Sequence, residues 1–324
     1  MVKRYFQLLL PLFLFFCIAS LIFIDQTWKP SPKQSIELYE HQIRSVGAKK
    51  AYEILSDELK NASYGEQHGQ AHNFGDALYH TTSLKGIHIC DSKFGFGCYH
   101  SFLEEAITDK GLSAINDLDN ECSKQFSKGG SCQHGIGHGI LSYLGDDKLS
   151  QALTLCTTLK SKKTFSCQVG VFMEFNVKTM DSEEKAIIRQ LDKDHPFTPC
   201  DTLEPQFQKV CYFTQTSIWP DVLDYKFPYY GVLCNQLTGQ NKLACLVGIG
   251  TNATIIADFS FTKARQMCDS LADSYSRIYC RAGASIALIS RQNFFDTKFF
   301  MCDGLGQNDK KDCEDYITNY FKNS

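Results

Sequence analysis

The spacing of the cysteines constrains this chain more than any other feature of its sequence. Of the 15 cysteines, 14 lie beyond the apolar N-terminal run and form consecutive pairs whose members are 8 to 12 residues apart. The first members of successive pairs follow one another at 32, 34, 44, 34, 34 and 34 residues. A fixed period of about 34 residues is typical of stacked helical repeats. The predicted disulfides join Cys90 with Cys98, Cys122 with Cys132, Cys156 with Cys167, Cys200 with Cys211, Cys234 with Cys245, Cys268 with Cys280 and Cys302 with Cys313.

Each unit has the pattern of two helices joined by a loop that the cysteine pair would close. Residues 112–122 and 148–156 have apolar side chains at helical spacing, and turn signals such as residues 109–111 and 145–147 separate the units. The sequence therefore predicts an all-α fold. We expect a right-handed αα superhelix, or solenoid, of about seven to eight helix hairpins, each closed by an internal disulfide.

The expected domain is a single unit spanning residues 41–324. The interval between Cys156 and Cys200 is longer than the others, and we assign the excess to an insertion at residues 181–199. The repeats at residues 60–145 carry the candidate metal site described below.

The cysteine pattern does not suit a metal site or a covalent haem. Structural zinc sites usually contain tight pairs such as C-x2-C, and the sequence has none. The C-x-x-C-H signature of c-type haem attachment is also missing. An even number of cysteines outside the N-terminal run instead favours a disulfide framework in an oxidising compartment.

The N-terminus predicts export. Lys3 and Arg4 precede an apolar run at residues 5–24, so residues 1–25 are expected to be a signal anchor or a cleaved signal peptide, with the N-terminus cytoplasmic. Residues 26–40 are expected to be a linker. The remainder would be extracytoplasmic, anchored to the membrane through this segment, or secreted or periplasmic after cleavage. The net charge of -3, with both signs interspersed, predicts no nucleic-acid partner.

The histidines gather in one part of the chain. Eight of the nine lie between His41 and His138, and three H-x3-[HE] motifs begin at residues 68, 100 and 134, with the same 32- and 34-residue offsets as the cysteines. Residues at i and i+4 share one helix face, which is how helices present two ligands to one metal. Stacked repeats would bring three such faces together. The predicted ligands are His68, His72, His100, Glu104, His134 and His138, with Glu105, Glu174 and His80 as further candidates.

Two other patterns carry expectations. Gly135, Gly137 and Gly139 lie beside the last histidine pair, and each costs about 1 kcal/mol in a helix relative to Ala, so a close approach of another backbone or of a ligand should offset that cost. Asn61 and Asn252 begin N-glycosylation sequons.

The leading functional hypothesis is an extracytoplasmic metalloprotein that binds one or two transition-metal ions. Imidazole and carboxylate ligands without thiolate suit Fe, Zn, Mn or Cu. Such a centre would activate O2, as in a hydroxylase-like or oxygenase-like oxidoreductase, or activate water for hydrolysis, and the oxidoreductase is preferred. The alternative is a non-catalytic solenoid whose groove binds a protein, peptide, glycan or small molecule in the cell envelope or extracellular space.

Overall fold

The protein is almost entirely helical, and its cysteines pair as their spacing predicts. The computed structural model describes residues 31–125, 131–178, 187–292 and 298–323. In every pair the two Cα atoms lie 5.4 to 5.9 Å apart, within the range that a disulfide requires. The expected all-α class and the local pairing of the cysteines are thus confirmed.

Each disulfide closes a loop inside one repeat, and no bond joins two repeats among these seven. Both sulfur-bearing residues of every bond are buried, at 3% exposure or less, so the bonds lie in the core between the paired helices. The bonds are Cys90 with Cys98, Cys122 with Cys132, Cys156 with Cys167, Cys200 with Cys211, Cys234 with Cys245, Cys268 with Cys280 and Cys302 with Cys313.

The longer helices of the repeats form a row that follows the order of the chain. Each begins one to six residues before the second cysteine of its unit, apart from α4, whose unit has no disulfide. These helices are α4 (Tyr64–Thr82), α5 (Gly97–Lys110), α7 (Ser131–Leu144), α9 (Thr164–Asn176), α10 (Pro205–Gln215), α13 (Gly239–Ile256), α15 (Ser274–Gln292) and α16 (Gln307–Asn323).

The remaining elements precede these helices within the repeats or connect them. The α-helices and strands are α2 (Pro32–Val46), α3 (Ala48–Glu58), α6 (Ile115–Gln125), α8 (Leu149–Cys156), β1 (Val177–Lys178), β2 (Ile187–Ile188), α11 (Trp219–Val222), α12 (Phe227–Cys234) and α14 (Phe261–Asp269). The short 3-10 helices are η1 (Leu59–Asn61), η2 (Ser83–Ile89), η3 (Lys93–Phe96), η4 (Leu112–Ala114), η5 (Asp146–Lys148) and η7 (Phe300–Cys302).

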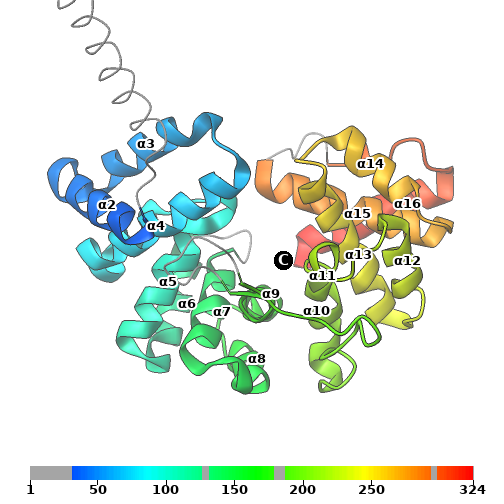
Figure 1. Cartoon of the computed structure of the whole chain (residues 1–324), viewed down its shortest axis with the longest axis horizontal. Coiled ribbons are helices and arrows are strands. Elements are labelled where there is room, and N and C mark those ends of the chain that lie inside the picture. The colour runs from blue at the N-terminus through cyan, green and yellow to red at the C-terminus, as the bar shows by residue number, and fades with distance from the viewer. Residues whose placement is uncertain (1–30, 126–130, 179–186, 293–297, 324) are drawn as a thin grey trace, which may run out of the picture.

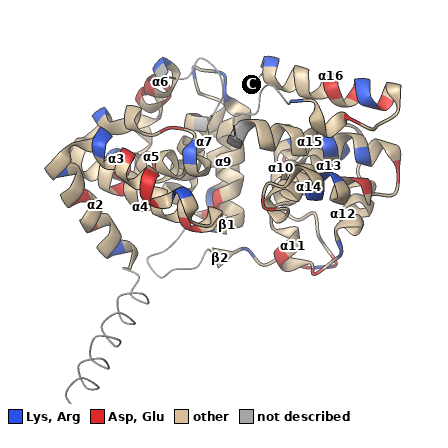
Figure 2. Ribbon diagram, turned by 90° about the horizontal axis from the view of Figure 1, so that it is seen from above, with Lys and Arg blue, Asp and Glu red and all other residues tan. Residues whose placement is uncertain are grey.

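Successive helices of the row pack on one another from α4 to α16. Figure 1 shows two groups of helices: an N-terminal half, α2 to α9, and a C-terminal half, α10 to α16. The contact of α9 with α10 joins the halves. The halves are also in contact where the rings of Tyr64 and Phe259 lie 5.2 Å apart. Lys and Arg are interspersed with Asp and Glu over both halves (Figure 2).

Glycines let neighbouring helices of the row approach each other closely. A Cβ atom on Gly135 would lie 2.8 Å from the backbone oxygen of Tyr99, and one on Gly75 would lie 2.5 Å from that of Cys98. Gly137 faces the backbone of α9 in the same way, and Gly139 faces that of α5. The neighbouring backbone, and not a ligand, therefore offsets the helical cost of the glycines.

The first described helix begins earlier than expected. Helix α2 starts at Pro32, so residues 32–40 are helical and the prediction that the linker extends to residue 40 is wrong. The Ser31 side chain accepts a hydrogen bond from the backbone NH of Gln34, and the Gln34 side chain accepts one from the backbone NH of Ser31. This capping box, with proline at the first helical position, is a strong helix start.

The predicted signal segment, residues 1–25, lies outside the described residues. Within the part of the chain that the structure describes, no helix combines the length and the apolar character needed to cross a membrane.

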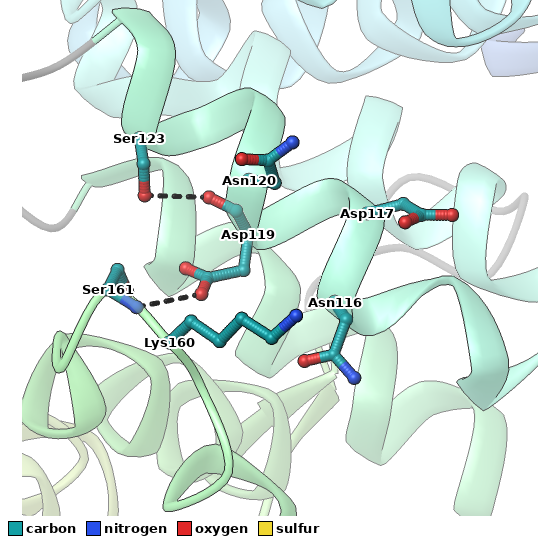
Figure 3. A pocket seen from close by; sticks show the side chains of 7 residues that line it. All are labelled: Asn116, Asp117, Asp119, Asn120, Ser123, Lys160 and Ser161. Atoms are coloured by element: carbon teal, nitrogen blue, oxygen red, sulfur yellow. Dashed lines mark hydrogen bonds between the residues drawn. The ribbon is translucent and has the colours of Figure 1, made fainter.

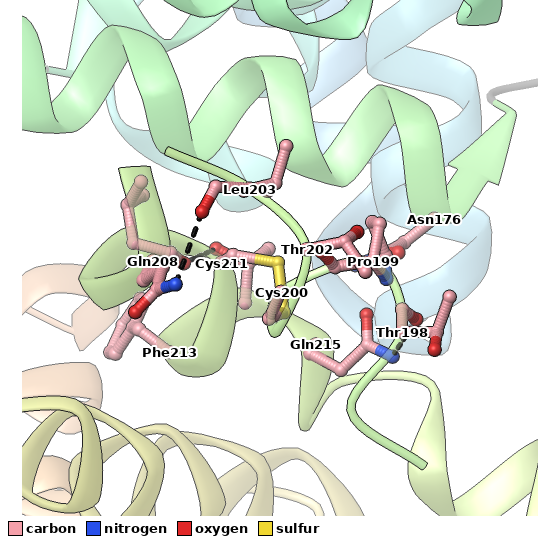
Figure 4. Close-up of a disulfide and its surroundings, with 12 residues drawn as sticks. Asn176, Thr198, Pro199, Cys200, Thr202, Leu203, Gln208, Cys211, Phe213 and Gln215 are labelled. Carbon is pink, nitrogen blue, oxygen red and sulfur yellow. Dashed lines mark hydrogen bonds between the residues drawn. A yellow bond between two sulfur atoms is a disulfide. The ribbon is translucent and has the colours of Figure 1, made fainter. Parts of the chain in front are cut away.

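The long third interval, between Cys156 and Cys200, contains the short ribbon β1–β2 and a loop that leads to α10. Arg189, just after β2, donates hydrogen bonds to the side chains of Asn176 and Gln215, at 3.1 and 2.7 Å from its Nη2 atom. The Gln215 side chain in turn donates to the carbonyl of Thr198 at 3.0 Å (Figure 4). The disulfide between Cys200 and Cys211 then fixes the end of this loop on α10 (Figure 4). The segment at residues 187–204 is thus held against α9 and α10.

Candidate metal centre

Five of the six predicted ligands come together on three adjacent helices. Helix α4 carries His68 and His72, α5 carries His100, and α7 carries His134 and His138. Because α5 packs against both α4 and α7, its single histidine lies between the two histidine pairs. We call these five residues the histidine centre.

Each pair has the geometry of two ligands of one metal ion. The Nε2 atoms of His68 and His72 are 3.1 Å apart, and those of His134 and His138 are also 3.1 Å apart. Two nitrogens bound to one ion at about 2.0 to 2.1 Å lie roughly 2.9 Å apart at a right angle and about 3.4 Å apart at the tetrahedral angle. The observed separations fall between these values.

His100 completes both pairs. Its ring centroid lies 5.3 Å from each of the rings of His68 and His72, 5.0 Å from that of His134 and 4.6 Å from that of His138. Two triads result, one of His100 with the α4 pair and one of His100 with the α7 pair. Within each triad the potential ligand atoms all lie within 4.8 Å of one another, so each could hold a metal ion.

The ring nitrogens of His100 have no hydrogen-bond partner among the described residues. Both Nδ1 and Nε2 are buried, and the residue is only 3% exposed. A buried polar atom without a partner costs about 1 to 3 kcal/mol, and native proteins rarely tolerate it without a reason. A metal ion on the ring nitrogens would supply that reason.

In each pair, one histidine is held in orientation by a hydrogen bond of Nδ1, the ring nitrogen that does not point to the other histidine. His68 Nδ1 lies 2.7 Å from the carbonyl oxygen of Phe94, which can only accept, so this nitrogen carries the hydrogen and Nε2 carries a lone pair. His138 Nδ1 donates to the Glu174 carboxylate at 3.0 Å in the same way. This is the arrangement that usually orients the histidine ligands of metal ions.

Burial keeps the inner histidines neutral. It lowers the pKa of His72 and His100 well below the usual histidine value, and the neighbouring histidines lower both further. Burial also lowers the pKa of His138 to about 4. Neutral imidazole is the form that binds a metal. His68 and His134 are half-buried, so the centre is reached from their side.

The predicted ligand Glu104 has a different partner. Its carboxylate accepts a hydrogen bond from Ser142 Oγ at 2.6 Å and belongs to neither triad. Burial and the nearby Glu174 raise the pKa of Glu104 to about 7. Asp76, which the sequence analysis did not single out, lies near it, and burial together with Glu105 and Glu104 raises its pKa well above the usual range. Its position four residues after His72 is the signal that could have identified it.

Two further candidates lie at the surface. His80 Nδ1 is 2.9 Å from a carboxylate oxygen of Glu40, and its Nε2 is 3.3 Å from one of Glu105. These side chains are 20 to 40% exposed, as is common for surface ion pairs. His80 and Glu105 are therefore not part of the histidine centre.

Two other features of the chain do not resemble functional sites. A shallow pocket between α6 and the loop after α8 is lined by polar side chains, but the Asp119 carboxylate there already accepts a hydrogen bond from the Ser161 backbone (Figure 3). It accepts another from the Gln133 side chain. Of the two sequons, Asn61 is exposed. Asn252 is buried and donates to Thr216 Oγ1, so its side chain is not accessible for glycosylation.

Comparison with known proteins gives no relative: no family model, curated protein sequence or solved structure matches the chain. The function is therefore inferred from the geometry of the histidine centre.

Proposed function

We propose that the protein is an extracytoplasmic metalloprotein that binds transition-metal ions at the histidine centre. The observation that supports the proposal most directly is His100, which belongs to both histidine triads and whose two buried ring nitrogens have no hydrogen-bond partner among the described residues. The seven disulfides indicate an extracytoplasmic or secreted protein. The row of helices that carries the centre is proposed to follow the predicted right-handed superhelix.

An all-imidazole ligand set narrows the choice of metal. Imidazole suits copper, zinc and iron, whereas manganese, magnesium and calcium favour carboxylate and carbonyl oxygens. Both triads consist of histidine alone, so copper, zinc or iron is the proposed ion. Copper binds most tightly to nitrogen sites in general.

The triads also indicate the kind of chemistry. Catalytic metal sites usually have three protein ligands and an open position for water or substrate, whereas structural sites are closed by four. Three histidines per ion leave such a position. A redox-active ion there would bind O2 or a reducible substrate, which is the oxidoreductase activity that we prefer, and zinc would instead activate water.

Metal content tests this proposal directly. The oxidised full chain is loaded with Cu2+ or Zn2+, freed of excess ion by gel filtration and analysed by elemental mass spectrometry. We expect at least one ion per chain. The double variant His72→Ala with His138→Ala, which removes one ligand of each triad, should retain less than a tenth of it, whereas His195→Ala, a histidine exposed in the insertion, should retain all.

Two results would contradict the proposal. One is a parent protein that holds far less than one ion per chain. The other is a double variant that keeps its metal while its circular dichroism shows an intact fold.

A further inference from the structure

We infer that His100 bridges two metal ions through its two ring nitrogens, so that the five histidines form one dinuclear centre and not two separate sites. The inference rests on the proposed function and adds the number of ions and the ligand that joins them. It makes His100 the residue on which both halves of the centre depend.

The position of His100 supports a bridge. It lies on α5, between the pairs of α4 and α7, and it belongs to both triads. If it gave only one nitrogen to one ion, the other nitrogen would remain buried without a partner. Two ions satisfy both nitrogens at once, and each ion then has three imidazole ligands.

The flanking pairs are prepared for an ion on each side. His68 on one side and His138 on the other carry the hydrogen on Nδ1, so that their Nε2 lone pairs are directed to the second histidine of the pair. A neutral bridging ring would have only one lone pair. Binding of the second ion must therefore displace the remaining ring N–H proton of His100, which leaves as one H+ to the solvent.

The bridge fixes the distance between the ions. Two metal–nitrogen bonds of about 2.0 Å and the width of an imidazole ring place the ions about 6 Å apart. An imidazolate ring transmits magnetic exchange between two Cu2+ ions at this separation, whereas two ions on unconnected sites would give independent signals.

Electron paramagnetic resonance of the full, oxidised chain titrated with Cu2+ alone is the test. At one equivalent we expect the full signal of an isolated ion with nitrogen ligands. At two bound equivalents the low-temperature integrated signal should fall below half of the value for two independent ions. In His100→Ala, any copper that still binds should give its full integrated signal. His195→Ala should behave as the parent.

Two outcomes would overturn the bridge while leaving the proposed function intact: two bound ions with full additive signal, or saturation at a single ion per chain. Absence of any bound copper would instead overturn the proposed function itself. If His100→Ala does not fold, calorimetry of Zn2+ binding to the parent in buffers of different ionisation enthalpy decides the question. The second ion should release one proton more than the first, and equal release would contradict the bridge.

Discussion

The two halves of the molecule share one packing scheme but differ in what they place inside it. In α7 the backbone of α9 passes close to Gly137, and in α13 the backbone of α15 passes close to Gly250 in the same way. Disulfides close the units of both halves with nearly the same geometry. Yet two residues after the second cysteine, α5 and α7 have His100 and His134, whereas α13 has Val247.

The comparison shows that the scaffold does not require the histidines. Val247 is 2% exposed and His100 is 3% exposed, so nearly equivalent buried positions accept an aliphatic side chain in one half and an imidazole in the other. Burying an imidazole without a partner costs stability, whereas burying valine stabilises the fold. The cost in the N-terminal half is understandable if the histidines serve a ligand.

Acid should weaken the N-terminal half first. Because the pKa of His138 is about 4 in the fold and about 6.5 in an unfolded chain, the unfolded state binds more protons between these values and stability falls as pH falls. In metal-free protein, the free energy of unfolding of the parent relative to His138→Gln should drop by about 3 kcal/mol from pH 7 to pH 4. Urea titrations at several pH values measure it.

His195→Gln is the control for this prediction, because the free energy that His195 contributes to stability should change with pH in the opposite direction. The hydrogen bond to Asp192 raises the pKa of His195. The stabilisation of the fold by this hydrogen bond is therefore present at low pH and is lost as pH rises. A relative free energy for His138→Gln that does not change with pH would show that the buried imidazole does not titrate with unfolding.

Removing a disulfide should affect both halves alike. The double variants Cys122→Ala with Cys132→Ala and Cys234→Ala with Cys245→Ala open loops of 10 and 11 residues, and loop closure predicts a loss of about 3 kcal/mol for each in metal-free protein. The two variants should differ in metal binding, because only the disulfide between Cys122 and Cys132 holds α7 in place. We expect lower Zn2+ affinity in the first variant alone, measured by competition with a chelator. Equally lowered affinities would mean that the two halves do not respond independently, and unchanged affinities in both variants would mean that the first disulfide does not hold the ligands in place.

Glu174→Gln should weaken metal binding without removing it. The amide keeps the shape of the side chain but loses the charge that accepts the hydrogen bond of His138 Nδ1, and loss of such a partner usually costs about 10- to 100-fold in affinity, or about 1 to 3 kcal/mol. Glu105→Gln, which changes a half-exposed carboxylate beside His80, is the matched control and should leave the affinity unchanged. Equal effects of the two variants would exclude an orienting role for Glu174.

His80→Ala should have the smallest effect. Its contacts with Glu40 and Glu105 lie at the surface, where an ion pair contributes at most about 1 kcal/mol. Thermal unfolding should therefore change little, and metal content should not change. Loss of metal in this variant would place the centre further along α4 than we propose.

The sequence predicted the features that depend on spacing along one chain segment. The cysteine period identified all seven disulfides among the described residues, from Cys90 with Cys98 to Cys302 with Cys313, and the H-x3-H spacing identified the pairs on α4 and α7. The sequence could not predict how far each helix is displaced along the axis of its neighbour. That shift brings Glu174, which is one position out of register, to His138, and it directs Glu104 to Ser142. Such shifts depend on where glycines let two backbones touch.

The contact between Tyr64 and Phe259 connects the surroundings of the histidine centre with the C-terminal half of the molecule. The Tyr64 ring stacks on His68 at 5.8 Å with an interplanar angle of 18°, and it also meets Phe259, in the connection between α13 and α14, at 5.2 Å. A change at His68 on capturing an ion would therefore reach Phe259 through a single aromatic ring. Tyr64 is thus the residue at which a change at the metal would first meet the C-terminal half.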